Sequence, residues 1–255
     1  MRPQSRTSRL TAAPGVATRV PEVERRGSLI VVGTPIGNLN DLSVRAAEAL
    51  ESADVVAAED TRRTIKLLQH VGSKAELIWL NDARAPASAI DGLLDRVESG
   101  ATVVLVSDAG MPAVSDPGAK VVNRAYERGL PVLGVPGPSA VTLALALSGF
   151  FAQRFVLLGF LSRKPGRMME TLAPYAESAL PIVLFERPER LPKVLEAALE
   201  VLGDRRVAVC RELTKAHEEV RRGSISALLR QELVHRGELT VVVEGWRKAR
   251  AEPDE

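Results

Sequence analysis

The chain has 255 residues, of which 45% are hydrophobic and 26% are charged, and its formal net charge is +2 at pH 7. This length and apolar content suffice for one large domain, or two smaller ones, with a real hydrophobic core. The near-neutral balance excludes a chain coated with basic residues for nucleic acid or membrane surfaces, so any site for anions must be local.

Both ends of the chain differ in composition from the rest. Residues 1–27 are rich in Arg, Ser, Thr and Pro and contain no apolar segment of the secretory type, which predicts a disordered N-terminal extension. A basic amphipathic targeting peptide is the alternative for this segment. Residues 247–255 have the composition of a solvated tail.

From Ser28 onward, short apolar runs alternate with amphipathic stretches, a pattern typical of strands alternating with helices. The predicted strands of the first half are residues 28–33, 54–60, 75–80, 101–108 and 130–135, and the predicted helices are residues 42–53, 61–72, 86–100, 118–129 and 139–149. This alternation favours a mostly parallel sheet covered by helices in a domain that spans residues 28–149.

The second half, residues 150–246, has strands that follow one another more closely. Strands are predicted at residues 154–161, 180–186, 205–213 and 238–246, with a basic turn leading into a helix at residues 162–179 and a helix at residues 190–203. We assign neither a helix nor a strand to residues 218–237. Close strand spacing favours a mixed sheet and a second α/β domain.

Cysteine, histidine and apolar runs exclude further classes. Cys210 is the only cysteine, which rules out an internal disulfide, and its run RVAVC predicts a buried thiol. His70, His217 and His235 lack the spacing of zinc ligands, so we expect no metal site. No apolar run reaches the roughly 20 residues that span a bilayer, so we expect a soluble protein. We also expect it to be cytoplasmic.

Turn-forming and polar residues follow four predicted strands of the first half. These segments are Gly33–Leu39, Glu59–Arg62, Ser107–Gly118 and Pro136–Ala140. Each alone is compatible with an ordinary turn or helix cap. Because the carboxyl ends of parallel strands meet at one edge of a sheet, where ligands of α/β proteins bind, the four together predict a site.

The residues at this edge indicate what the ligand is. Neither GxGxxG nor GxxxxGK[ST] is present, so the fingerprints for dinucleotides and for phosphate are missing. Asp60, Asp108 and Asp116 would repel a polyphosphate unless a metal intervened, but they suit a ligand that carries hydroxyls, an ammonium or a sulfonium. S-adenosylmethionine carries all three.

Several short words of the sequence occur in an order that resembles one known family. They are TPIGNL, AEDTR, SDAG-P followed by DPG, PGPSA, GF, ELTK, and GE before the last strand. The chain resembles, over about Ser28 to Gly245, the rRNA small subunit methyltransferase I family of the tetrapyrrole-methylase-like (class III) methyltransferases. The resemblance implies two α/β domains with a cofactor cleft between them.

The resemblance also implies the activity. It implies S-adenosylmethionine-dependent methylation of the ribose 2′-hydroxyl of a cytidine in the decoding region of 16S rRNA, by a homodimer that acts on the small ribosomal subunit. The positions expected to bind the cofactor are Thr34, Pro35, Asp108, Ala109, Gly110, Met111, Ser139, Ala140, Phe185, Leu213 and Thr240.

Methyl transfer to a hydroxyl also requires that a proton be removed, and a general base contributes about 10²–10⁴-fold to the rate. Glu59, Asp60 and Lys215 are the candidates for this base or for an orienting group. For Asp60 a helix cap, and for Lys215 a surface ion pair, is the alternative interpretation. The base stays unassigned among them.

Local cations provide candidates for contacts with RNA phosphates. They are Arg62, Arg63, Arg163, Lys164, Arg167 and Arg211. The turn SRKPGR is the most informative, because its Pro-Gly pair would present the cations at a domain edge. A solvated charged face is the alternative interpretation. Aromatic residues make up only 4% of the chain, so stacking on bases is not expected to dominate RNA binding.

The sequence departs from the family pattern at Met111, where the family has Thr, and at Asn81, where it has His. Longer relatives continue into a small helical region beyond the position of Glu255, and we expect RNA contacts to differ accordingly. Two other functions fit the architecture: a small-molecule methyltransferase of the tetrapyrrole type, and a non-catalytic ribosome-assembly factor.

Overall fold

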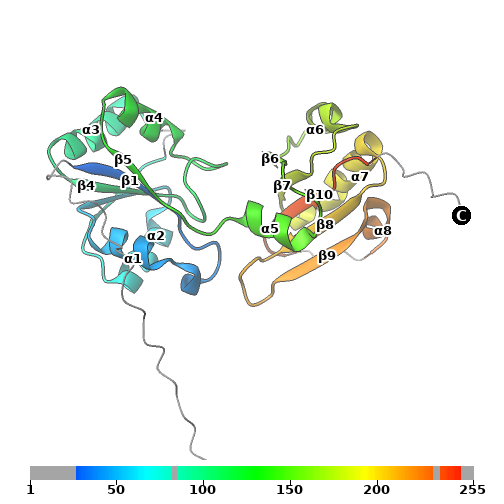
Figure 1. The fold of residues 1–255 in the computed structure, drawn as a ribbon, viewed down its shortest axis with the longest axis horizontal. Coiled ribbons are helices and arrows are strands. Elements are labelled where there is room, and N and C mark those ends of the chain that lie inside the picture. The colour runs from blue at the N-terminus through cyan, green and yellow to red at the C-terminus, as the bar shows by residue number, and fades with distance from the viewer. Residues whose placement is uncertain (1–26, 82–84, 232–235, 248–255) are drawn as a thin grey trace, which may run out of the picture.

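The computed structural model describes residues 27–81, 85–231 and 236–247. The predicted extension and tail, apart from their residues nearest the folded part, lie outside these ranges. Two α/β units lie side by side and are joined through the segment that leads into α5 (Ala140–Ser148) (Figure 1). None of the helices in the described ranges has the length and apolar character that a bilayer crossing requires.

The first unit is built on a five-stranded sheet in which all the neighbouring strands run parallel, as the alternating sequence pattern predicted. In sheet order the strands are β3 (Glu76–Trp79), β2 (Val55–Ala58), β4 (Thr102–Val106), β1 (Ser28–Val32) and β5 (Val132–Val135). All four residues of β2 are buried, which fits a central strand of a parallel sheet covered on both faces.

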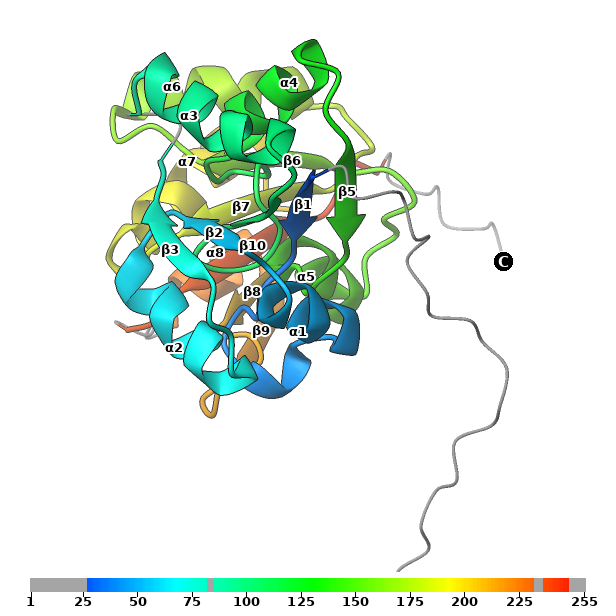
Figure 2. The same cartoon turned by 90° about the vertical axis from the view of Figure 1, so that its left-hand side faces the viewer.

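Helices cover both faces of this sheet (Figure 2). One face packs on α1 (Val44–Glu51) and α2 (Thr61–Val71) through apolar residues such as Leu50 and Leu68. The other face packs on α3 (Ala87–Glu98) and α4 (Ala119–Glu127). The helices therefore cover the faces and leave the carboxyl ends of the strands to the connecting loops.

The second unit contains a five-stranded mixed sheet, which confirms the expectation for the second half. In sheet order the strands are β6 (Val156–Phe160), β7 (Ile182–Glu186), β10 (Leu239–Val243), β8 (Arg206–Arg211) and β9 (Glu219–Ser224). Only β6 and β7 pair in parallel, and the other neighbours are antiparallel. One face packs on α6 (Pro165–Leu172), α7 (Leu191–Leu202) and α8 (Ile225–Leu229).

Helix α5 covers the opposite face of the second sheet. Val141, Ala144 and Leu145 are buried against Val183 of β7 and Val242 of β10. The chain therefore passes from one sheet to the other before Ala140, whereas the sequence pattern groups residues 139–149 with the first domain. The limits 28–149 and 150–246 stay a prediction.

The unassigned segment 218–237 contains β9 and α8. Strand β9 reads EVRRGS and lacks a run of apolar residues, so its sequence gives no clear signal for a strand. It forms because its backbone pairs with the antiparallel edge of β8 over six residue pairs. Cys210 of β8 is fully buried, as predicted, and burial raises the pKa of its thiol to about 11.

Candidate functional site

A cavity of about 350 Å³ lies between the two units, at the carboxyl ends of the first sheet. Its size falls within the roughly 300–1,000 Å³ that small-molecule sites occupy. The first unit contributes the loops after β1 and β4, and the second contributes residues of β6, β7 and β10. Val141, at the start of α5, also lines it.

Two of the loops are paired through their backbones. The backbone N–H of Thr34 donates to Gly110 O at 2.9 Å, and Gly110 N–H donates to Thr34 O at 3.1 Å. The Thr34 hydroxyl also donates to Ser107 O at 3.3 Å. Gly110 has φ +81°, a conformation in which a side chain would be strained. The loops after β1 and β4 therefore act as one piece of structure.

The loop after β5 contacts the loop after β1 through two glycines. A Cβ atom on Gly33 would lie 2.5 Å from Gly137 N, and a Cβ on Gly137 would lie 2.5 Å from the carbonyl carbon of Gly33. The sulfur of Met111 would be 2.6 Å from the same Gly33 Cβ. Met111, which replaces the family's Thr, therefore packs against this contact and also lines the cavity.

Most of the predicted cofactor positions are brought together here. Those that line the cavity are Ala109, Gly110, Met111, Ser139, Ala140, Phe185, Leu213 and Thr240. Thr34, Pro35 and Asp108 instead line a separate pocket of about 260 Å³. The sequence did not indicate which face of each loop points toward the cavity, and the assignment of these residues to a cofactor stays a prediction.

Asp108 does not line the cavity, contrary to the expectation from its place after β4. Its Oδ1 accepts a hydrogen bond from the backbone N–H of Asp60 at 3.0 Å, and its Oδ2 lies 3.7 Å from Arg63 Nη1. These contacts direct the carboxylate toward the start of α2. Asp108 therefore connects the loops after β2 and β4.

Other residues of the SDAGMPAVSDPG loop take its place in the cavity. Val114 and Asp116 line it. The sequence analysis named Asp116 only as an acid that suits the ligand, not among the cofactor positions, and it did not name Val114. Ala113 has φ 68° and Ser115 has φ 61°, values that are uncommon for residues other than glycine and that occur often at functional sites. The DPG word was the available signal for Asp116.

The second unit also contributes residues that the sequence reasoning did not name. Phe160, Arg187 and Glu238 line the cavity. The signals for Phe160 and Glu238 were the words GF and GE, which were noted but not translated into site positions. Asn81, the other departure from the family, is not among the lining residues; its carbonyl accepts a hydrogen bond from Ala85 N at 2.7 Å.

Three carboxyl groups at this edge have raised pKa values. Burial is the main cause for Glu59, and the nearby charges of Asp108 and Asp116 raise its pKa further. Burial also raises the pKa of Asp116, although a hydrogen bond from Ser107 opposes the shift. Burial raises the pKa of Asp108, and Arg63 opposes it. Carboxylates of this kind bind protons more readily than exposed ones.

The other two catalytic candidates are held in their charged forms. Asp60 caps α2: its Oδ1 accepts from Arg62 N at 2.9 Å, and its Oδ2 lies 2.7 Å from Arg62 Nη2. Side-chain hydrogen bonds from Arg62 are the main reason that the pKa of Asp60 falls to about 2. These are the contacts expected of a helix cap, and such a weak base accepts protons poorly.

Lys215 forms two ion pairs, at 2.9 Å to Glu212 Oε1 and 2.9 Å to Glu238 Oε2. Burial, the largest single influence, lowers the pKa of Lys215, but the hydrogen bonds to Glu238 and Glu212 outweigh it and the net pKa is raised. The ammonium therefore stays protonated at neutral pH. These contacts match the ion-pair interpretation.

The ELTK loop around Lys215 contacts the first unit directly. A Cβ on Gly37 would lie 2.5 Å from Lys215 Cγ and 2.9 Å from Thr214 Oγ1. Thr214 has φ 66°, which is rare for a β-branched residue. Its hydroxyl oxygen is buried without a hydrogen-bond partner within the described ranges. The two units thus meet where a strained loop approaches a glycine.

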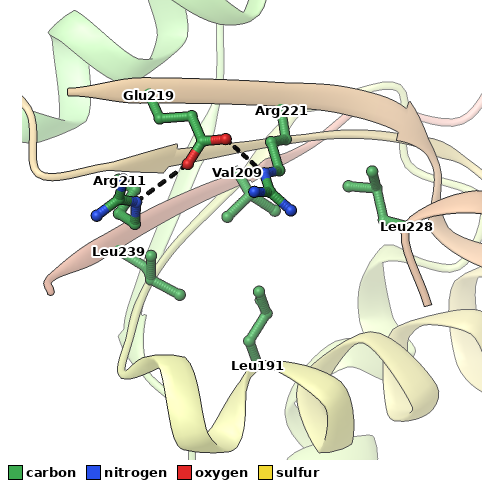
Figure 3. A pocket seen from close by; sticks show the side chains of 7 residues that line it. All are labelled: Leu191, Val209, Arg211, Glu219, Arg221, Leu228 and Leu239. Carbon is green, nitrogen blue, oxygen red and sulfur yellow. Dashed lines mark hydrogen bonds and ion pairs between the residues drawn. The ribbon is translucent and has the colours of Figure 1, made fainter. Parts of the chain in front are cut away.

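Three of the predicted RNA-binding cations are engaged in ion pairs. Arg62 pairs with Asp60, and Arg63 lies near Asp108. Arg211 pairs with Glu219 at 3.1 Å, and Arg221 pairs with the same carboxylate at 2.6 Å (Figure 3). These groups face apolar side chains around a void of about 20 Å³, which is about one water in size. The Arg211 guanidinium is therefore engaged in an ion pair within the second unit.

The other three predicted cations differ from this group. Arg163 and Lys164 are exposed in the turn between β6 and α6, and Arg167 is exposed in the first turn of α6. Across the described ranges, no carboxylate pairs with any of the three side chains. The turn and the start of α6 therefore present three positive charges to solvent, after a strand whose last residue, Phe160, lines the cavity.

The sequence matches the family model of tetrapyrrole (corrin/porphyrin) methylases over residues 28–229. It is 43% identical over 221 residues to the protein named ribosomal RNA small subunit methyltransferase I of Thermotoga maritima, covering 86% of this chain and 99% of that protein. It is 46% identical over 223 residues to the protein of the same name from Mycobacterium tuberculosis, covering 86% of this chain and 78% of that one.

Solved structures share the fold at lower identity. Uroporphyrin-III-C-methyltransferase from Thermus thermophilus superimposes with a TM-score of 0.61 at 24% identity, covering 85% of this chain and 94% of that chain. A diphthine synthase superimposes with a TM-score of 0.63 at 18% identity, covering 85% of this chain and 89% of that chain.

Proposed function

The chain belongs to the tetrapyrrole (corrin/porphyrin) methylases and, among them, to the ribosomal RNA small subunit methyltransferase I family, and from this premise we propose its substrate and site. It is an S-adenosylmethionine-dependent methyltransferase of 16S rRNA in the small ribosomal subunit. We propose that the acceptor is the ribose 2′-hydroxyl of a cytidine in the decoding region. The main support for placing the site here is the cavity that residues of both units line.

The chemistry of the cavity fits S-adenosylmethionine. Its walls combine apolar side chains with the carboxylates of Asp116, Glu186 and Glu238, and Arg187 is the cation among its described lining residues. The donor's sulfonium and ammonium are positive, so carboxylates complement them. Gly110, with its positive φ, allows the loop to approach a ligand closely.

The start of α5 offers a further complement. Ser139 is the N-cap of α5, and its side chain makes no capping hydrogen bond. The first N–H groups of a helix lack partners within the helix and favour negative groups. We propose that the donor's carboxylate or ribose hydroxyls lie near Ser139 and Ala140, both of which line the cavity.

When bound, the donor supplies a methyl group attached to a positively charged sulfur. The residues of both units hold donor and hydroxyl in line, and such placement contributes roughly 7–11 kcal/mol to a reaction of this kind. Asp116 accepts the proton of the attacking hydroxyl, because it lines the cavity and its pKa is raised. Glu59 lies close enough for the charge of Asp116 to influence it and is the alternative acceptor.

RNA is held outside the cavity by cations. Arg163, Lys164 and Arg167 contact phosphates, since all three are exposed and lack carboxylate partners within the described ranges. Arg62, exposed but paired with Asp60, contributes less. Recognition then depends on the shape of the assembled subunit. The enzyme works in the cytoplasm as a homodimer, which the family resemblance supports.

Purified protein is incubated with methyl-labelled S-adenosylmethionine and either small ribosomal subunits that lack the modification or tetrapyrrole precursors. We expect label on 16S rRNA alone. Label on the tetrapyrrole alone would identify a small-molecule enzyme. Tight subunit binding without any transfer would identify an assembly factor. Light scattering of the same sample tests the dimer.

A further inference from the structure

Phe160 has an unusual position for a large apolar side chain. It ends β6, lines the cavity and is nevertheless 62% exposed. Its ring centroid lies 5.7 Å from that of Phe185, at an interplanar angle of 46°. Phe185 is only partly exposed and lies deeper, as a member of the β7 strand paired with β10. Phe160 therefore forms an apolar surface at the mouth of the cavity.

The backbone just before Phe160 departs from regular strand geometry, and this departure directs the ring toward the cavity. The pairing of β6 with β7 shifts register between Leu157 and Gly159, which is the signature of a β-bulge. Gly159 has φ +62°, and a Cβ there would lie 3.3 Å from Ser115 Oγ. Bulges redirect side chains and occur often next to active sites. The exposure of Phe160 thus follows from a defined local geometry.

The turn that follows Phe160 is fixed by hydrogen bonds from one arginine side chain. Arg190 Nη2 donates to Leu161 O at 3.0 Å and to Ser162 O at 3.2 Å. The same nitrogen lies 3.3 Å from Glu186 Oε2, and the Glu186 side chain is only 2% exposed. A ring that is fixed before a ligand arrives loses little conformational freedom on binding.

The charges around Phe160 favour a nucleic acid as the occupant. Arg163 and Lys164 follow three and four residues later, exposed and without carboxylate partners in the part of the chain that the structure describes. Arg187 is exposed on the cavity lining. An aromatic face beside cations suits an unpaired nucleotide, whose base stacks while its phosphate pairs with the cations.

We propose that Phe160 is the stacking platform for an unpaired base of the RNA substrate, at or next to the methylated nucleotide. The inference rests on the proposed function, because it takes the substrate to be RNA. The adenine of the methyl donor is the other nucleobase that could reach this region. The exposed position of Phe160, outside Phe185, favours the RNA base.

The test compares Phe160→Ala with Phe160→Tyr, which keeps an aromatic face. Stacking on an aromatic side chain contributes enough that the alanine variant should lose roughly 10-fold or more in kcat/KM for ribosomal subunits. The tyrosine variant should stay within about two-fold of the wild type by the same reasoning. The Kd for S-adenosylmethionine, measured by calorimetry, should change by a smaller factor in the alanine variant than its kcat/KM for subunits does.

Phe151→Ala is the matched control, because Phe151 is also a phenylalanine, is 67% exposed and does not line the cavity. If Phe160→Ala methylates subunits as well as the wild type does, the platform is disproved while the proposed function stands. Weaker donor binding with unchanged subunit binding would assign the ring to adenine and overturn the inference. If the wild type transfers no methyl group, the proposed function fails, and equal subunit affinity of the variants would then refute the platform separately.

Discussion

Two aspartates of one loop show how the direction of a side chain decides its role. Asp108 follows β4 directly, yet its carboxylate faces the start of α2. Asp116 lies further along, after two residues with positive φ, and lines the cavity. Both are buried enough for their pKa values to be raised. Only Asp116 is placed to take a proton from a substrate in the cavity.

Asp116→Asn should lower kcat by about 10²–10⁴-fold, because the amide cannot accept the proton. It should also stabilise the fold at pH 7. Since burial raises the folded-state pKa of Asp116 above 3.8, stability from this group is complete below about pH 3.8 and is lost as the pH rises through the folded pKa. Single-turnover rates and unfolding at pH 7 and pH 4 measure both effects.

Asp95→Asn on α3 is the control, because this carboxylate is 65% exposed and does not line the cavity. The wild-type rate should rise with pH as Asp116 loses its proton, and the variant should lack this rise. A variant with the wild-type rate and pH profile would exclude Asp116 and leave Glu59 as the acceptor.

Elements position the site through contacts between loops more than through the sheets themselves. Gly33 and Gly137 meet where the loops after β1 and β5 cross, and Gly37 meets the ELTK loop. Such contacts depend on the absence of a Cβ atom at specific positions. They fix the mouth of the cavity while the sheets supply rigid support.

Gly137→Ala should destabilise the protein by roughly 1–3 kcal/mol, because the new Cβ would overlap the backbone of Gly33. It should also weaken binding of S-adenosylmethionine by displacing the loop. Gly134→Ala on β5 is the control, since nothing lies within 4 Å of the Cβ that it adds. Urea unfolding and calorimetry measure the two effects. Equal free energies of unfolding for the two variants would show that the loops rearrange to fit the added Cβ, and would contradict the prediction.

Replacing Arg163, Lys164 and Arg167 together by Ala should weaken binding to the ribosomal subunit and flatten its dependence on salt. For every phosphate that the variant no longer neutralises, the slope of log K against log salt should become shallower by roughly 0.7–0.9. Exposed cations elsewhere in the chain, Lys74, Lys193 and Arg230, supply a control variant with the same change in charge. If the slope of log K against log salt is the same for the wild type and both variants, these three cations do not contact RNA phosphates.

The sequence predicted most elements because their apolar patterns are regular, as in the buried run of β4. It missed β9, whose polar residues form a strand only through pairing with β8. It did not indicate that α5 packs on the second sheet, because a helix with apolar residues on most sides does not reveal which sheet it covers. The loops at the strand ends predicted a site at this edge of the sheet, but they gave no indication of the direction of Asp108, which depends on a hydrogen bond from a distant loop.

At the scale of the whole molecule, neither unit contains the site alone. Ile36 of the first unit packs against the core of the second, and Gly37 contacts Lys215. The cavity is therefore formed by the way the two sheets are joined. A ligand that contacts both units should stabilise their relative arrangement, by about 2.7 kcal/mol at a concentration of 100 times its Kd.

Saturating S-adenosylmethionine should therefore slow amide hydrogen exchange in both units. Residues 109–111 and 213–215 should be protected together, because both loops line or border the cavity. Edge strand β3, Glu76–Trp79, lies at the far end of the first sheet and is the internal control. Protection of one unit only would indicate a site that does not span the two.

The most direct test is a crystal structure of the protein with S-adenosylhomocysteine. We predict electron density in the cavity between the units, in contact with the loop Ala109–Met111, the start of α5, and Phe185, Leu213 and Thr240. Density in the pocket beside Thr34, Pro35 and Asp108, with the cavity between the units left without ligand, would contradict the account.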